Sequence, residues 1–196
     1  MITNYTGSRI TLQIGSGRRT EEVEVLNFGN FDFMGLGARQ ELKDASKKAL
    51  EMYGCGSCGP RGFYGTIKPH ITLEETFAAF VGVDNSIMYS DGASTSSSTV
   101  AAFAKRGDLL VVDEGIYEGL LTGVTLSRSN VKTFKHNDMV DLERVLTEVR
   151  KEDVRLKRNV LDQRRFIVCE GLYRNYGTIL KVGSERASER AKRRMQ

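Results

Sequence analysis

The sequence has no tryptophan, only two prolines and only two histidines among its 196 residues. So few prolines leave helices largely uninterrupted, which favours helices and buried strands joined by tight turns. No apolar run in the sequence approaches the roughly 20 residues that a membrane-spanning helix needs. The first ten residues also lack the charged-then-apolar order of a secretory signal. We therefore expect a globular chain without a membrane span.

Cysteine is scarce as well, with only Cys55, Cys58 and Cys169. An odd and small number argues against a disulfide framework and favours a reducing compartment. Cys55 and Cys58 form a C-x-x-C, but neither histidine has the spacing of a metal ligand. Pro60 and the glycines around it favour a loop, whereas a redox C-x-x-C opens a helix. We therefore expect no metal site.

The excess of positive charge is confined to one end of the chain. Residues 181–196 carry six Lys or Arg and two Glu, a net charge of +4, which equals that of the whole chain. Removing them from the totals of 29 basic and 25 acidic residues leaves 23 charges of each sign. A body without net charge has no basic face dictated by its composition, so we expect no nucleic-acid partner.

Short apolar segments alternate with amphipathic helical segments along most of the chain. The predicted strands are 87–89, 109–112, 131–134 and 166–169, and the predicted helices are 39–53, 71–81, 93–106, 115–127 and a helix that Asp138 caps. Apolar strands separated by helices indicate a mostly parallel sheet covered on both faces. Residues 10–28 predict a hairpin, and the charged segment 150–165 is expected to be a surface excursion.

A glycine-rich loop at 54–65 contains G-x-G-x-x-G. A dinucleotide site needs a strand before this motif and a helix after it, whereas here a helix precedes it and Pro60 follows. Two interpretations remain open. The loop is a turn-rich connector, or its backbone, beside Arg61, Phe63 and Tyr64, closely approaches a ligand or a partner chain.

Three further places carry weaker patterns. Residues 90–98 form a serine-rich strand-to-helix junction, which fits either a phosphate-binding turn or an ordinary helix cap. The sequence His136-Asn137-Asp138 is more typical of a cap and turn than of a catalytic group. Glu170 follows a predicted strand, where α/β proteins place ligands.

Several motifs, in this order, resemble one family. They are YGCGSCGPRGFYGT at 53–66, IMYSDG at 87–92, KRGD at 105–108, FKHNDM at 134–139 and EGLY at 170–173. From about residue 27 to 179 the chain resembles the first, non-lysine long-chain-base subunits of serine palmitoyltransferase. These belong to the α-oxoamine synthases, pyridoxal-phosphate enzymes with the aspartate-aminotransferase fold.

The resemblance implies an α/β fold, namely a partial, truncated aspartate-aminotransferase-like large domain with a mostly parallel sheet and flanking helices. We expect an N-terminal extension with a hairpin at 1–26, the partial pyridoxal-phosphate-dependent transferase domain at 27–180, and a basic, disordered tail at 181–196. The family pattern stops after residue 179, which suggests a shortened reading frame.

The resemblance also implies a function. Serine palmitoyltransferase joins serine to palmitoyl-CoA with loss of carbon dioxide, giving 3-ketosphinganine in the first step of sphingolipid biosynthesis. The first subunit is non-catalytic and pairs with a catalytic subunit that holds pyridoxal phosphate, an electron sink, and acyl-CoA and serine bind at the shared site. We expect the cytosolic face of the endoplasmic reticulum, or the cytoplasm for an unpartnered short form.

Individual positions carry this resemblance further. Gly92 and Ala93 match the cofactor-phosphate turn of the family. Tyr117 stands where catalytic members have the histidine that stacks on the cofactor ring, and Arg174 stands where they have a small hydroxyl residue. The cofactor lysine and aspartate of the family fall in later segments that this sequence does not contain. These departures imply a chain without catalytic residues of its own.

By the same resemblance the loop at 54–66 faces the cofactor of the partner, with Cys58, Arg61, Phe63 and Tyr64 at the shared site. Two other functions remain as alternatives. One is a self-sufficient α-oxoamine synthase, which requires a cofactor lysine of its own. The other is a small nucleotide-binding or RNA-binding α/β protein.

Overall fold

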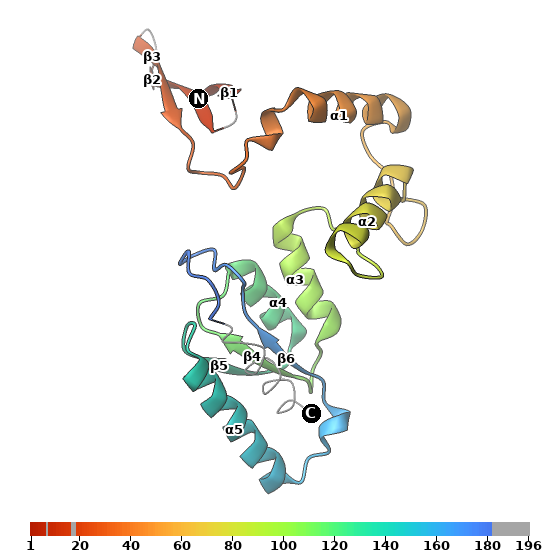
Figure 1. Ribbon diagram of the computed structural model, residues 1–196, viewed down its shortest axis with the longest axis vertical. Coiled ribbons are helices and arrows are strands. Elements are labelled where there is room, and N and C mark those ends of the chain that lie inside the picture. Colours follow the sequence, from red (N-terminus) through yellow and green to blue (C-terminus); the bar gives the residue numbers. More distant parts are fainter. Residues whose placement is uncertain (7, 17–18, 182–196) are drawn as a thin grey trace. The chain divides into compact units, whose positions relative to one another are not determined.

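The computed structural model describes residues 1–6, 8–16 and 19–181. The chain divides into two compact units, Met1–Met88 and a second unit that begins at Tyr89, and each has its own architecture (Figure 1). Apart from Lys181, the predicted tail at 181–196 lies outside the described residues. The predicted domain limits at residues 26 and 180 stay predictions.

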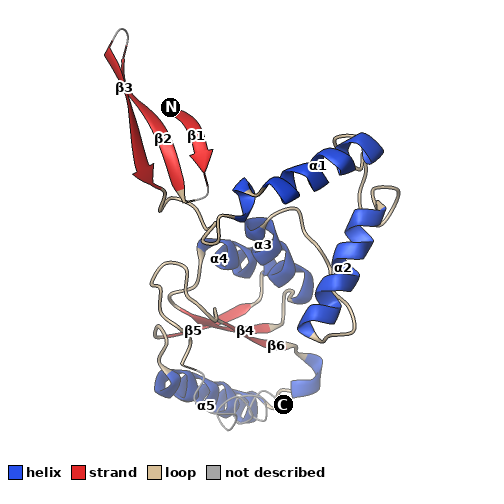
Figure 2. Ribbon diagram, turned by 45° about the horizontal axis from the view of Figure 1, so that its top comes forward, coloured by secondary structure: helices blue, strands red, loops and turns tan. Residues whose placement is uncertain are grey.

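The first unit begins with an antiparallel sheet of three strands, β1 (Ile2–Thr6), β2 (Arg9–Ser16) and β3 (Arg19–Leu26), in the order β1-β2-β3. The pairing of β2 with β3 confirms the predicted hairpin (Figure 2). Strand β1 was not predicted, because its five residues mix polar and apolar side chains without alternation. The segment after the sheet is fastened by Tyr5, whose hydroxyl donates to Asp32 at 2.6 Å.

The first unit continues through a short turn, η1 (Leu36–Ala38), and two helices, α1 (Gln40–Tyr53) and α2 (Lys68–Val81). Helix α1 confirms the prediction for 39–53. Helix α2 begins three residues before the predicted 71, because Pro69 suits a first turn and the His70 ring accepts the N–H of Ile67 at 3.3 Å. Four apolar side chains at helical spacing in α2 are exposed: Leu73, Phe77, Phe80 and Val81.

The predicted strand at 87–89 is wrong, since these residues pair with no strand in the described part of the chain. Ile87 is 74% exposed. The N–H of Met88 donates to the carboxylate of Glu74 at 2.8 Å, and the hydroxyl of Ser86 donates to the Glu74 carbonyl at 2.7 Å. Helix α2 therefore supplies the hydrogen bonds that a neighbouring strand would have supplied.

The second unit is a three-layer α/β structure. Strands β4 (Leu109–Asp113), β5 (Asn130–Phe134) and β6 (Arg165–Val168) form a parallel sheet in the order β5-β4-β6. Helices α3 (Gly92–Phe103) and α4 (Glu118–Ser127) lie on one face, and α5 (Met139–Leu156) lies on the other (Figures 1 and 2). This arrangement confirms the predicted parallel sheet with flanking helices.

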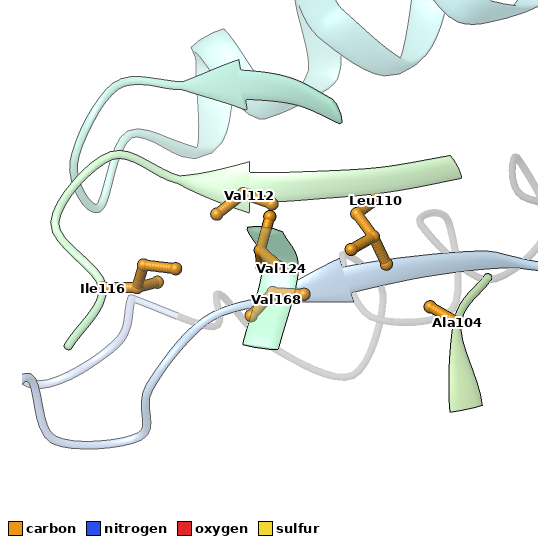
Figure 3. Packing of buried hydrophobic residues seen from close by; sticks show 6 residues of the cluster. All are labelled: Ala104, Leu110, Val112, Ile116, Val124 and Val168. Carbon is orange, nitrogen blue, oxygen red and sulfur yellow. The ribbon is translucent and has the colours of Figure 1, made fainter. Parts of the chain in front are cut away.

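The core follows from the alternation of side chains along β4, whose five residues are all buried. One face sends Leu110 and Val112 towards α3 and α4, where they meet the rest of the cluster shown in Figure 3: Ala104, Ile116, Val124 and Val168. The other face sends Leu109 and Val111 towards α5, against a second cluster: Phe134, Val145, Leu146 and Val149. A strand buried on both faces is apolar throughout, which is why β4 was recognisable in the sequence.

Two predicted limits need correction. Helix α3 ends at Phe103 rather than 106, because the N–H of Lys105 turns to the carboxylate of Asp108 at 2.9 Å. The segment 150–165 is only partly a surface excursion, since α5 continues to Leu156 and a further turn, η2 (Val160–Asp162), follows. Asp153 of α5 is buried and forms a two-point ion pair with Arg165, at 2.7 and 3.0 Å.

Candidate functional site

The carboxyl ends of the three parallel strands converge on Asp113, the last residue of β4. Its side chain is fully buried and accepts four hydrogen bonds. The donors are the N–H of Gly115 at 2.7 Å, the N–H of Asn137 at 2.8 Å, the ring Nδ1 of His136 at 3.0 Å and the hydroxyl of Tyr173 at 2.7 Å. One carboxylate therefore joins the segments that follow β4, β5 and β6.

The charge of Asp113 persists despite its burial. Burial raises the pKa of this carboxyl, but the hydrogen bonds from Asn137, Tyr173, His136 and Gly115 outweigh burial and hold the pKa below its ordinary value. The pKa of Tyr173 is raised, first by burial and then by its hydrogen bond to Asp113. Tyr173 therefore stays protonated and acts as a permanent donor.

Segment 171–181 folds back over this end of the sheet and is fastened by His136 and Asn137. The ring Nε2 of His136 lies 3.0 Å from the hydroxyl of Thr178. The side-chain amide of Asn137 donates to the carbonyl of Ile179 at 2.9 Å and accepts the N–H of Lys181 at 2.8 Å. His136 and Asn137 therefore do more than form the predicted turn.

Asp138 accepts the N–H groups of Val140 and Asp141 and caps α5 as predicted. Tyr176 stacks on the His136 ring, with centroids 4.3 Å apart. Capping and stacking fix the direction in which the chain leaves β5, and with it the place of the imidazole.

Beside this cluster lies Glu170, which follows β6. Its carboxylate accepts the N–H of Tyr117 through Oε1 and the N–H of Arg174 through Oε2, the latter at 3.2 Å. The guanidinium of Arg174 lies over the ring of Tyr117, 4.4 Å from the ring centroid. The two positions at which the sequence departs from catalytic members of the family are therefore in direct contact.

Gly92 and Ala93, which by resemblance match a cofactor-phosphate turn, lie in the first turn of α3. Two donors of this turn are already engaged by Asp91, whose carboxylate accepts the N–H of Ser94 at 2.8 Å and its hydroxyl at 2.6 Å. The Ser94 hydroxyl first, and then the Ser94 N–H, lower the pKa of Asp91. This helix N-terminus therefore holds an anion that belongs to the chain itself.

Pyridoxal phosphate, the cofactor that the resemblance implies, needs free donors for its phosphate and a free aromatic face for its ring. At the start of α3 the Asp91 carboxylate takes the N–H and the hydroxyl of Ser94 and places a negative charge where the phosphate would bind. At Tyr117 the Arg174 guanidinium lies on the ring. The residues present in this chain do not fit the cofactor in the arrangement described.

The glycine loop of the first unit is organised by Arg61. Its guanidinium donates to both carboxylate oxygens of Glu74 in α2, at 3.0 and 2.8 Å, and its Nε donates to Thr66 at 3.1 Å. The Thr66 hydroxyl in turn donates to the Arg61 carbonyl at 2.7 Å. Arg61, predicted at a shared site, thus has an intrachain role that the sequence did not indicate.

The glycines of the loop let it fold on itself. A Cβ on Gly65 would lie 1.6 Å from the carbonyl oxygen of Gly59, which no side chain tolerates. In the same loop Cys58, Phe63 and Tyr64 are exposed, and the rings of Phe63 and Tyr64 lie 4.8 Å apart. Of the two interpretations left open for the loop, a close approach of its backbone to a ligand or partner is not needed to explain Gly65, because Gly65 closely approaches Gly59 of the same loop.

The predicted site residues fall into two groups that lie in different units. Cys58, Arg61, Phe63 and Tyr64 share one loop of the first unit, whereas Gly92 and Ala93 lie in the second. Neither group forms a set of metal ligands, and the described residues contain no cluster of that kind. Among the described helices none has the length and apolar composition needed to cross a bilayer.

Sequence reasoning missed the cluster around Asp113. A signal existed, because an aspartate at the end of an all-apolar strand must find donors when it is buried. Its partners, His136 and Tyr173, lie 23 and 60 residues away in the sequence. A local sequence pattern cannot identify hydrogen-bond partners that lie so far apart along the chain.

The parallel sheet, its flanking helices and the polar cluster at its carboxyl edge are features of a known class of enzyme fold. Residues 22–183 match the family described as aminotransferase class I and II, and the chain belongs to this family.

Within this class the chain is similar to curated relatives with more specific names. Long chain base biosynthesis protein 1 of Arabidopsis thaliana is 44% identical over 156 residues, which cover 80% of this chain and 32% of that relative. Serine palmitoyltransferase 1 of Dictyostelium discoideum is 43% identical over 178 residues, 91% of this chain and 36% of that relative. The chain thus spans about a third of the length of these relatives. The resemblance found in the sequence is confirmed.

Solved structures agree on the fold. Serine palmitoyltransferase of Sphingomonas wittichii matches with a TM-score of 0.77 at 22% identity, over 89% of this chain and 41% of that one. A second match, described as SPT with PLP, has a TM-score of 0.80 at 20% identity, over 99% of this chain and 44% of that one. The α/β prediction of a partial aminotransferase-like domain is confirmed.

Proposed function

We propose that this chain acts in a serine palmitoyltransferase as its first, non-catalytic subunit. It pairs with a catalytic subunit, and the complex joins serine to palmitoyl-CoA, releasing carbon dioxide and giving 3-ketosphinganine. The proposed location is the cytosolic face of the endoplasmic reticulum. The observation that carries the proposal is the identity of 43–44% to first-subunit relatives across 80–91% of this chain.

The proposal assigns the cofactor to the partner. Pyridoxal phosphate supplies the electron sink for the chemistry, and the catalytic subunit binds it. Two observations support this assignment: Asp91 engages the N–H and hydroxyl of Ser94 at the start of α3, and the Arg174 guanidinium lies over the ring of Tyr117. The same two observations disfavour the alternative of a self-sufficient synthase.

The proposal assigns the loop at 54–66 to the shared site. Arg61 and Glu74 hold the base of the loop, and Phe63 and Tyr64 project from it, 80% and 63% exposed. Two adjacent exposed aromatic rings are typical of contact surfaces. Cys58, also exposed, belongs to the same surface, which orients serine and acyl-CoA against the partner.

Co-expression tests this function. This chain, carrying an affinity tag, is produced together with a catalytic subunit of the same source, purified through the tag and supplied with serine, palmitoyl-CoA and pyridoxal phosphate. We expect the catalytic subunit to co-purify and 3-ketosphinganine to form, whereas this chain alone gives no product. Product formation by the chain alone, or a folded chain that retains no catalytic subunit, would contradict the proposal.

The loop is tested in the same complex. Replacing Phe63 and Tyr64 together with Ala should lower the amount of catalytic subunit recovered or the rate of product formation by roughly tenfold, as truncation of aromatic anchors does elsewhere. The matched control is Phe28→Ala, at a phenylalanine of the same unit that is 89% exposed. An unchanged complex in the loop variant would remove the loop from the shared site.

A further inference from the structure

The contact between Arg174 and Tyr117 brings together two segments at the carboxyl edge of the parallel sheet. Tyr117 precedes α4, and Arg174 lies in the turn after β6. The guanidinium carbon stands 4.4 Å from the ring centroid, within the range of a cation–π contact. The face of the Tyr117 ring that the guanidinium covers is not available for stacking on a ligand.

The backbone holds both residues in place. Glu170 accepts the N–H groups of Tyr117 and Arg174 with its two carboxylate oxygens. On the side of α4 the ring packs against Gly119, where an added Cβ would lie 2.4 Å from Tyr117 Cε1. Tyr117 therefore contacts both its own helix and the guanidinium, and glycine at 119 is what makes room for the ring.

The turn that carries Arg174 is also anchored on its far side. The neighbouring Tyr173 is fully buried and donates to Asp113 at 2.7 Å, and Thr178 meets His136 at 3.0 Å. Within the turn the N–H of Tyr173 donates to the carbonyl of Thr178 at 2.9 Å. These bonds fix the backbone from which the Arg174 side chain reaches Tyr117.

We propose that Arg174 is a specificity-determining residue that closes the aromatic subsite of this chain against planar ring ligands such as the pyridine ring of pyridoxal phosphate. Ligands of α/β sheets lie at the carboxyl edge of the strands, and the guanidinium occupies one face of the ring on which such a ligand would stack. The Asp91 carboxylate at the start of α3 disfavours the phosphate of the same ligand by repulsion between like charges. The inference rests on the proposed function for the identity of the ligand, and it deepens that function by naming what keeps the cofactor off this subunit.

The test measures binding of pyridoxine 5′-phosphate, which has the ring and the phosphate of the cofactor but no aldehyde to react with lysines. Equilibrium dialysis is performed on the full chain, on Arg174→Ser, and on Arg174→Ser combined with Tyr117→His. We expect the wild type to bind weakly and both variants to bind at least tenfold more tightly, the double variant most. Arg144→Ser, at an exposed arginine of α5, is the matched control and should bind as the wild type does.

Two results would overturn the inference. Equal binding of the probe by wild type and variants would show that the Arg174 guanidinium does not close the aromatic subsite. Weaker binding by Arg174→Ser, with inorganic phosphate competing against the probe, means that Arg174 is a phosphate ligand instead.

A second measurement avoids dependence on the isolated chain. In the complex with a catalytic subunit, the cofactor content per complex should rise in the double variant above that of the wild type, and an unchanged content contradicts the inference. The outcome is separate from that of the proposed function, because co-purification and product formation by the wild-type complex do not depend on either variant.

Discussion

Glu74 engages Arg61 at two points, with Oε1 3.0 Å from Nη1 and Oε2 2.8 Å from Nη2. Glu74 also accepts the N–H of Met88 at 2.8 Å. The hydrogen bond to Arg61, followed by the one from Met88, holds the pKa of Glu74 below its ordinary value. A single carboxylate thus ties the glycine loop and the segment after α2 to the same helix.

Glu74→Gln removes the negative charge from the Arg61–Glu74 ion pair and should increase the mobility of the glycine loop. We expect amide hydrogen exchange at Phe63 and Gly65, whose N–H groups both donate to the Pro60 carbonyl, to accelerate by roughly tenfold, as expected when a charge-assisted hydrogen bond is lost. Hydrogen exchange followed by mass spectrometry of the loop peptides measures this.

The matched control for that prediction is Glu24→Gln. The Arg9–Glu24 pair lies in the same unit at 2.6 Å, but both side chains are more than half exposed. Exposed pairs contribute little to stability, so exchange in β2 and β3 should not change. Equal acceleration in both variants, or none in the loop, would show that Arg61 does not organise it.

Gly65→Ala should disrupt the loop, because the new Cβ would lie 1.6 Å from the Gly59 carbonyl oxygen. Gly62→Ala should be tolerated, since nothing lies within 4 Å of a Cβ there. Limited digestion with trypsin at Arg61 compares the two variants, and we expect roughly tenfold faster cleavage in Gly65→Ala only. Similar cleavage of both would contradict the close approach of the two glycines.

Asp113 should make the second unit sensitive to acid. Its folded-state pKa lies below the ordinary 3.8, so its contribution to the free energy of unfolding is full above that value and is lost as the pH falls through the lower, folded-state pKa. Asp113→Asn should lower stability at neutral pH by about 1–3 kcal/mol and flatten the loss of stability that the wild type shows as the pH falls below 3.8.

Urea unfolding followed by circular dichroism measures this effect. Asp162→Asn, at an exposed carboxylate of the same unit, serves as the control and should follow the wild type. An Asp113→Asn profile parallel to the wild type would show that the carboxylate is not ionised at its four donors.

The buried ion pair between Asp153 and Arg165 makes a different prediction. Their side chains are 8% and 3% exposed, so Arg165→Met leaves a buried carboxylate with a weakened set of partners and should cost about 3 kcal/mol in urea unfolding. Replacing both, Asp153→Leu with Arg165→Met, should recover most of that loss. A double variant no more stable than the single one would contradict this account.

The sequence was sufficient for the framework of the second unit. Strand β4 is apolar throughout because both faces are buried, and Asp138 marks the start of α5 because its carboxylate accepts two N–H groups there. Patterns of this kind are local, and the structure confirms them. The resemblance to the family, which the relatives confirm, supplied the rest of the fold.

The sequence did not predict the structure where a side chain takes the place of a neighbouring strand as hydrogen-bond partner, or where a residue is buried by a partner far away along the chain. Residues 87–89 have the apolar character of a strand, yet Glu74 takes the N–H of Met88. The charged run at 150–165 conceals the buried Asp153, because burial there depends on Arg165 arriving with β6. The candidate site was the part least predictable from the sequence, since Asp113 and Tyr117 contact residues far away along the chain.

Glu170 connects two segments at the carboxyl edge of the sheet. Because its two oxygens accept N–H groups from the segments before α4 and after β6 at once, one substitution at this position would weaken the backbone support of Tyr117 and Arg174 together. A change at this one position would therefore act on both partners of the cation–π contact without a substitution in either of them.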